Sequence, residues 1–270
     1  MKVDITSKRY HKKTIIRDIH FNARPGTMML VLGTSGVGKS TLIKCLVNET
    51  GYEGSVQYEK GEGAGIAYIS QHPGFNESET PLQALTYAGL YADPRAGYRK
   101  TEKKAERMLQ SLGIGGVCNK RIHCLSGGQR QRVAIGREQM RNSKVWLMDE
   151  PFSALDPATA RTLAKDISNV THKQGRTTII ISHNVNDLVY FDSLLILAKG
   201  GDDVGRMAYL GAPCNMPGYF QKSDPVDVMV MLNGTDGNGG STADYYIKAM
   251  EKARRDSGNT YLNAGCVAFQ

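Results

Sequence analysis

The chain lacks any long hydrophobic run. Its apolar segments are only as long as strands, such as Thr177–Ser182 (TTIIIS), whereas a helix needs about 20 apolar residues to cross a bilayer. The first ten residues, MKVDITSKRY, contain no apolar stretch of the kind found in secretory signals. We therefore expect the protein to stay in the cytoplasm.

Cysteines are few, and their arrangement is not that of a small domain stabilised by disulfides or by zinc. The five cysteines form no CxxC pair, and their number is odd. This pattern argues against a disulfide framework and against a zinc site built from cysteines.

Positive charge is in excess but is not concentrated. The net charge is +8, yet the densest basic segment, Tyr98–Arg107 (YRKTEKKAER), alternates with acidic residues and has no aromatic platform. We interpret this segment as a solvated helix face rather than a binding patch, and we expect no nucleic-acid partner.

Short runs that are apolar on both faces recur along the chain. Strands of this kind lie in the middle of a parallel sheet covered by helices, and helix-like segments separate them here. The pattern predicts an α/β fold with a parallel sheet core. The predicted strands are Met28–Leu32, Gly65–Ser70, Val145–Asp149, Thr177–Ser182 and Leu194–Ala198.

The other segments predict the domain organisation. Alternating residues before residue 24 indicate a small N-terminal antiparallel β subdomain, and residues of about 81–140 indicate a helical subdomain inserted into the sheet core. Together they form one domain over residues 1–232. NGTDGNGGST predicts a Gly-rich linker over residues 233–242, and residues 243–270 are expected to be a tail, partly helical or disordered.

A glycine-rich segment between a predicted strand and a predicted helix fits the phosphate-binding pattern G-x-x-x-x-G-K-[ST] in full. Its backbone N–H groups and the helix N-terminus suit phosphate oxygens. Lys39 supplies a cation for the β and γ phosphates, and Ser40 offers a hydroxyl to Mg²⁺. The predicted triphosphate-binding residues are Gly33, Thr34, Ser35, Gly36, Val37, Gly38, Lys39, Ser40 and Thr41.

The strand Val145–Asp149 ends in two carboxylates, Asp149 and Glu150. Asp149 is placed to hold the hydration shell of Mg²⁺. Glu150 emerges at the carboxyl end of the strand, where open α/β sheets bind ligands, and is placed to polarise an attacking water. Such an ending alone is typical of any strand that leaves the core, but together with the phosphate loop it predicts catalysis.

A second glycine-containing helix start reads LSGGQ: Leu125, Ser126, Gly127, Gly128 and Gln129. Serine is a good N-cap and glycines leave the free N–H groups accessible, so this helix end also suits an anion. A simple capped helix is the alternative. Because the chain has only one carboxylate strand of the required kind, we expect this segment to contact the γ-phosphate held by another copy in a twofold dimer.

LSGGQ after GxxxxGKST, followed by a strand and DEP, resembles the nucleotide-binding domain of ABC transporters over roughly residues 3–232. The resemblance implies a P-loop NTPase (RecA-like) fold that binds ATP and Mg²⁺ and hydrolyses ATP. It also implies a nucleotide-dependent homodimer, or a paired ABC domain, attached to a transmembrane permease domain or subunit on the inner face of the cell membrane.

The resemblance gives roles to four further residues. Gln71 resembles a contact to Mg²⁺ and water, and Asp156 lies in a loop that crosses the dimer interface. His183 resembles the switch histidine that touches the γ-phosphate and completes the catalytic pair with Glu150. Tyr10 resembles the aromatic residue that stacks on adenine, although His11 or a nearby basic residue fits the same place. Without the resemblance, Gln71 is equally a turn residue and His183 a structural histidine.

The segment Phe191–Leu232 resembles the tail of the G-type, or white-type, exporter domains. Asn184 and Gln129 depart from the commonest eukaryotic spellings, which fits a prokaryotic relative with a similar export architecture. We therefore expect export. The alternative is an ABC ATPase that acts on DNA or the ribosome. However, the 87 positions from Lys39 to Ser126 contain no coiled-coil heptads, and the chain has one ATPase unit rather than two.

Overall fold

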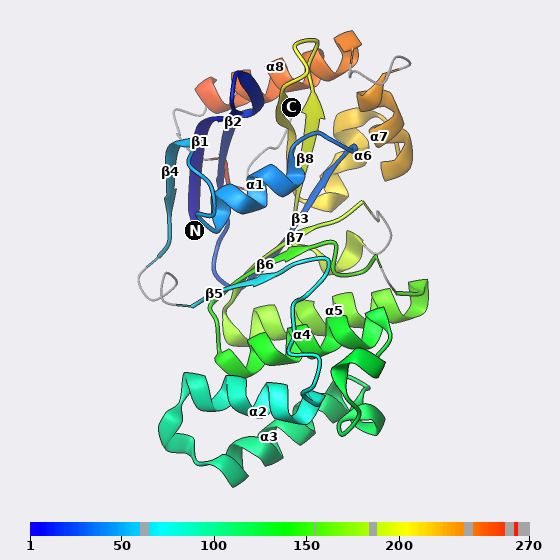
Figure 1. Ribbon diagram of the computed structural model, residues 1–270. Helices are drawn as coiled ribbons and strands as arrows, with labels where there is room; N and C mark the ends of the chain where they lie inside the picture. Colours follow the sequence, from blue (N-terminus) through cyan, green and yellow to red (C-terminus); the bar gives the residue numbers. More distant parts are fainter. Residues whose placement is uncertain (60–64, 154, 184–187, 235–239, 257–261, 264–270) are drawn as a thin grey trace.

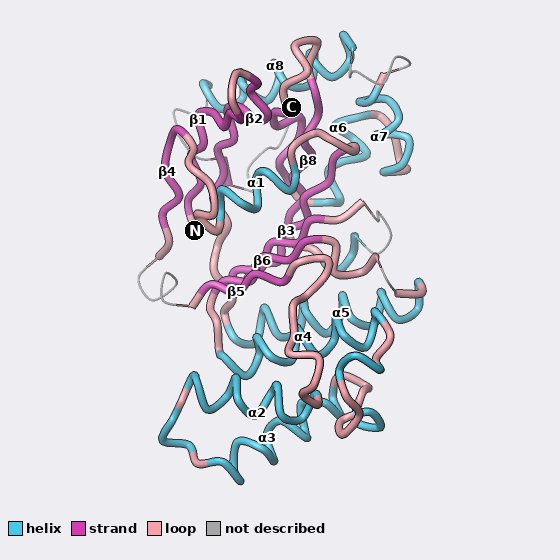
Figure 2. The backbone as a smooth tube through the Cα atoms, viewed as in Figure 1, coloured by secondary structure: helices cyan, strands magenta, loops and turns pink. Residues whose placement is uncertain are grey.

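A computed structural model describes residues 1–59, 65–153, 155–183, 188–234, 240–256 and 262–263. In these residues a mixed sheet of ten strands runs through the middle of the molecule, with helices on both faces (Figures 1 and 2). The strand order is β4-β1-β2-β9-β8-β3-β7-β6-β5, and β10 (Leu262–Asn263) pairs with β2.

The buried half of this sheet is parallel, as the apolar runs predict. β3 pairs with β7 and β8, and β6 pairs with β7 and β5, all in parallel. Because the carboxyl ends of parallel strands meet at one edge, the loops that follow them are brought together there. The bounds are β3 Thr27–Gly33, β5 Ile66–Ile69, β6 Val145–Asp149, β7 Thr177–Ile181 and β8 Ser193–Lys199.

The other half of the sheet is largely antiparallel. β1 pairs with β2 and with β4, and β9 pairs with β8, all antiparallel; β9 meets β2 in parallel at one point, Ile16 beside Gly205. The sequence predicts β1 and β2 but not β4, whose residues EGSVQ lack an apolar face. The bounds are β1 Lys2–Tyr10, β2 Lys13–Asn22, β4 Glu53–Gln57 and β9 Gly205–Gly211.

The two faces of the sheet pack into two separate hydrophobic cores. Successive side chains of a strand point to opposite faces, and β6 shows the alternation clearly. Trp146 and Met148 enter the core shared with the long helices, whereas Val145 and Leu147 enter the core beneath α1. The helices are α1 Lys39–Leu46, α2 Pro81–Ala92, α3 Tyr98–Ser111, α4 Gly127–Arg141 and α5 Pro157–Gln174.

These elements confirm the predicted α/β fold, with its N-terminal antiparallel part and its inserted helices. Figure 1 places α2 and α3 at the end of the molecule farthest from α1. Gly89 of α2 allows the close packing there, because a Cβ would lie 2.6 Å from Thr101 and 2.7 Å from Met140. In the described residues no helix has both the length and the hydropathy needed to cross a membrane.

The C-terminal part folds back onto the sheet. It contains α6 (Met216–Phe220), α7 (Pro225–Asn233) and α8 (Gly240–Asp256). α8 packs against β9 and β8, and its side chains Ala243, Ile247 and Met250 are buried. The helix therefore begins inside the segment predicted as linker, because apolar residues spaced along one face dock it to the sheet.

Candidate active site

A cleft of about 600 Å³ opens at the carboxyl ends of β3 and β6. It collects residues from the phosphate loop, from β2, from the ends of three other strands and from α7. Its lining residues are Ile15, Leu32, Gly33, Thr34, Ser35, Gly36, Gly38, Lys39, Ser40, Thr41, Gln71, Asp149, Glu150, His183 and Met229. Residues predicted separately from the sequence thus meet in one cavity.

The phosphate loop has the backbone conformation that its glycines permit. Gly36 and Gly38 have φ angles of 73° and 106°, in the left-handed region that favours glycine. A Cβ at Gly38 would lie 2.3 Å from a side-chain carbon of Ile16, so the loop also packs too closely on β2 for another residue. Val37 is the one predicted loop residue that does not line the cleft. Its side chain is fully buried in the core beneath α1, and its backbone N–H donates to the Thr34 oxygen at 3.3 Å, so Val37 fixes the shape of the loop from outside the cleft.

Lys39 is held at the floor of the cleft. Its ammonium donates to the backbone oxygens of Gly33 at 2.6 Å and Thr34 at 3.1 Å. Burial lowers the pKa of Lys39, while the carboxylates of Glu150 and Asp149 act in the opposite direction. A cation in this position is available to bind the oxygens of a phosphate chain.

The two carboxylates differ in their surroundings. Burial, followed by the charge of Glu150, raises the pKa of Asp149 above its usual value. Glu150 has a φ of 51°, a left-handed conformation that costs a non-glycine residue about 1 kcal/mol or more. Its backbone N–H donates to Ile181 at 2.9 Å, which fixes the turn after β6. The turn therefore directs the Glu150 side chain into the cleft.

Glu150 and His183 form a close pair. The Oε2 atom of Glu150 lies 2.8 Å from Nδ1 of His183 and 3.4 Å from the backbone nitrogen of the same residue. The carboxylate is only 13% exposed, whereas the imidazole is 68% exposed. The glutamate is thus sheltered and oriented, while the histidine faces the open side where a ligand enters.

The oxygen donors in the cleft suit Mg²⁺. Ser40, Gln71 and Asp149 line the same cavity, and Mg²⁺ in triphosphate sites takes one or two protein oxygens together with water and phosphate. In the described part of the chain, no group of three or more His, Cys, Asp or Glu residues forms a metal cage of its own. The oxygen donors Ser40, Gln71 and Asp149 leave coordination positions for the water and phosphate oxygens that Mg²⁺ keeps in triphosphate sites.

Tyr10 does not line the cleft. It ends β1 with 40% of its surface exposed, and the Lys8 ammonium lies 4.3 Å from its ring centroid. Ile15, which the sequence did not single out, lines the cavity instead, as does Met229 of α7. Ile15 could have been found only from its place on β2 beside the phosphate loop. The position of Met229 in the cleft depends on how α7 folds back.

The LSGGQ segment lies outside the cleft of its own chain, and so does Asp156. Ser126 caps α4: its Oγ accepts from Gln129 N at 3.3 Å, and the Gln129 side chain accepts from Ser126 N at 3.1 Å. Leu125 is buried, whereas Gly127 is exposed. Asp156 caps α5 by accepting from Thr159 N at 3.0 Å. The hydrogen bond from the Thr159 side chain, followed by this backbone contact, lowers the pKa of Asp156.

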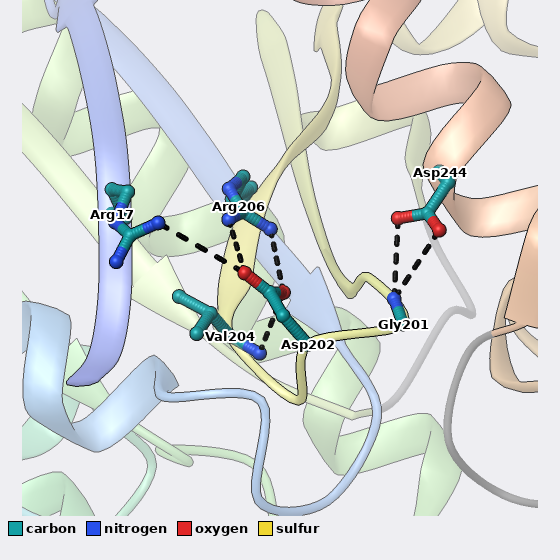
Figure 3. Close-up of polar contacts among 6 residues, drawn as sticks. All are labelled: Arg17, Gly201, Asp202, Val204, Arg206 and Asp244. Atoms are coloured by element: carbon teal, nitrogen blue, oxygen red, sulfur yellow. Dashed lines mark hydrogen bonds and ion pairs between the residues drawn. The ribbon is translucent and has the colours of Figure 1, made fainter. Parts of the chain in front are cut away.

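A hairpin between β8 and β9 supports the phosphate loop from behind. Asp202 pairs with Arg206 and lies 3.9 Å from Arg17, while Gly201 N–H donates to Asp244 of α8 (Figure 3). Gly205, at the end of this hairpin connection, lies directly against the phosphate loop. A Cβ at Gly205 would lie 2.0 Å from the backbone oxygen of Val37.

A phosphate loop, a carboxylate strand and a histidine at one edge of a parallel sheet define a P-loop nucleoside triphosphatase. The family model described as ABC transporter matches residues 16–153. The chain belongs to the ABC transporter family, as an ATP-binding subunit or domain, and such domains are ATPases.

Curated relatives agree with this assignment. The chain is 31% identical over 199 residues to the taurine import ATP-binding protein TauB of Escherichia coli K12, covering 71% of this chain and 76% of the relative. It is 33% identical over 195 residues to the aliphatic sulfonates import ATP-binding protein SsuB 1 of Rhodococcus jostii, covering 72% and 77%.

Among solved structures, cbiO1 of Clostridium perfringens, part of an ABC transporter complex, has the same fold. It superposes with a TM-score of 0.68 at 24% identity, over 80% of this chain and 89% of that one. The names of the taurine and sulfonate relatives describe import. The expected similarity to G-type exporters therefore finds no support in these relatives, although the tail motif in Phe191–Leu232 pointed to it.

Proposed function

We propose that this chain hydrolyses ATP to drive a substrate through a transmembrane permease partner, from a place on the cytoplasmic face of the membrane. The observation that carries the proposal is the cleft itself, which joins Lys39, Asp149, Glu150 and His183 from separate strand ends. The names of the import relatives favour uptake as the direction. The molecule transported is selected by the permease, not by this cleft.

In the proposed mechanism, the loop N–H groups and Lys39 bind the triphosphate. Ser40, Asp149 and Gln71 would hold Mg²⁺, which when bound neutralises phosphate charge. Glu150 orients or deprotonates the attacking water, because its carboxylate is sheltered and fixed. His183, the exposed member of the pair, steadies the γ-phosphate. Most of the rate enhancement comes from positive groups fixed in advance around the phosphates.

We propose further that the catalytic unit is a dimer. The α4 N-terminus lies outside its own cleft, and its capping box satisfies Ser126 and Gln129 within the helix start. The N–H groups of Gly127 and Gly128 stay available for an anion, and a second copy supplies one in its phosphate loop. Asp156 lies at the same interface in this arrangement, and the exposed ring of Tyr10 stacks on adenine.

Glu150→Gln tests the catalytic assignment. The variant should bind ATP, lose about 10²- to 10⁴-fold in turnover as expected for a general base, and accumulate an ATP-dependent dimer in gel filtration. Glu106→Gln, at an exposed position of α3, is the matched control and should behave as wild type. Normal hydrolysis by the Glu150 variant would show that another group activates the water.

A further inference from the structure

A second cleft, of about 760 Å³, lies between the carboxyl ends of α2 and α4 and one flank of α3. It belongs to the end of the molecule formed by α2 and α3, away from α1 and the phosphate loop (Figure 1). Its charged lining residues are Asp93, Lys100, Lys103, Lys104, Arg107 and Arg141. Five of these six groups are cations.

Helix geometry creates this concentration of charge. Acidic and basic residues alternate along the sequence of α3, so the sequence predicts an ordinary solvated face. At 100° per residue, however, Glu102 and Glu106 fall on the opposite flank from Lys100, Lys104 and Arg107. Neither glutamate lines the cleft. The helix therefore separates charges that the sequence mixes.

The cations of α3 are not neutralised within the described residues. No carboxylate there lies within 4.0 Å of the charged groups of Lys100, Lys103, Lys104 or Arg107. Arg141 is partly compensated, because it lies 3.4 Å from Glu138 and 5.3 Å from the ring centroid of Tyr91.

A purely structural explanation covers only part of this charge. Cations at a helix C-terminus complement the helix dipole, and two such ends, of α2 and α4, line the cleft. Each helix end supplies about half a negative charge. The two ends, Asp93 and Glu138 together offset about three of the five positive charges, so roughly two positive charges remain. Like charges spaced three or four residues apart also destabilise α3. Folding alone therefore does not account for the arrangement.

We propose that this cleft is a second anion site, which binds a multivalent phosphate group. Lysine ammonium groups and an arginine fork around a concave surface are suited to phosphate oxygens, and the volume exceeds that of a single phosphate. The ligand is a soluble polyphosphate or the phosphorylated headgroup of a lipid. This inference goes beyond ATP hydrolysis and does not depend on it, because the two clefts share no residue.

The test uses full-length protein carrying Lys39→Ala, which weakens phosphate binding in the first cleft. Tripolyphosphate binding is measured by calorimetry before and after adding Lys100→Gln, Lys104→Gln and Arg107→Gln. The matched control adds Lys120→Gln, Lys173→Gln and Lys222→Gln, three exposed lysines outside the cleft. Both triple variants lose the same charge, and circular dichroism checks that both fold.

We expect the cleft variant to bind at least about tenfold more weakly than the control, because each charged hydrogen bond contributes about one order of magnitude. Cosedimentation with phosphatidylcholine vesicles containing phosphatidic acid, whose phosphomonoester headgroup can carry two negative charges, forms the second arm. If tripolyphosphate does not bind to the protein, and the cleft variant alone loses vesicle binding, the site is assigned to a lipid headgroup. Equal losses in both triple variants, or no binding of either probe, would overturn the proposal.

Discussion

Replacing Gly205 by alanine tests whether the β8–β9 hairpin fixes the phosphate loop. Gly205 begins β9 and does not have a left-handed backbone conformation, so alanine is resisted there by space alone. Its Cβ would lie 2.0 Å from the backbone oxygen of Val37 and 3.3 Å from that of Ile15. Both neighbours are backbone atoms, which cannot rotate away as a side chain can.

The size of the effect follows from this contact. To reach an ordinary van der Waals separation of at least 3.4 Å, the carbonyl of Val37 must move by about 1.4 Å. A displacement of about 1 Å at a catalytic site already reduces the rate by about 10²-fold. Overpacking of this kind also lowers the free energy of unfolding by about 1–3 kcal/mol. We therefore expect a folded protein with greatly reduced kcat/KM for ATP, although no residue of the cleft has been changed.

Steady-state ATP hydrolysis and thermal unfolding measure the two effects separately. Gly116→Ala is the matched control, because a Cβ at Gly116 meets nothing within 4 Å. It should leave both measurements unchanged. If Gly205→Ala hydrolyses ATP as fast as the wild type and Gly116→Ala, the hairpin does not position the loop, and the account of its support is refuted.

Two further predictions concern stability. Asp244→Ala removes the carboxylate that accepts from Gly201 N–H at 3.2 and 3.3 Å. We therefore expect the free energy of unfolding to fall by about 1 kcal/mol and the Tm by about 2–4 °C. An unchanged Tm would show that α8 is held by its apolar face alone. Burial raises the pKa of Cys45 from the usual 9.0 to about 11, so the folded thiol keeps its proton at a pH where the unfolded thiol ionises. As the pH rises between these two values, the wild type should lose about 1.4 kcal/mol of stability per pH unit relative to Cys45→Ala, measured by urea unfolding. Parallel pH profiles for the two proteins would contradict the raised pKa of Cys45.

The local pattern of the sequence was sufficient for much of the fold and the centre of the site. Apolar runs such as Val145–Asp149 identify buried strands because burial on both faces leaves no polar position. The phosphate loop was also readable, because Gly36, Gly38 and Lys39 are required at fixed spacings by backbone conformation and charge. These features depend on neighbours within a few residues.

Other features depend on contacts between distant segments, and the sequence could not supply them. Ile15 and Met229 enter the cleft, and Val37 leaves it, because of how β2, α7 and α1 pack. Asp244 reaches the hairpin only because α8 folds back onto β9.

The sequence by itself therefore determined which segments form buried strands and helices, and it determined the chemistry of the phosphate loop. Both follow from local periodicity and backbone conformation. Only the tertiary structure decided which side chains face the nucleotide, how Gly205 supports the loop and how the charges of α3 gather at one cleft. Packing brings residues together across long sequence separations, and helix rotation sorts charges that alternate along the chain.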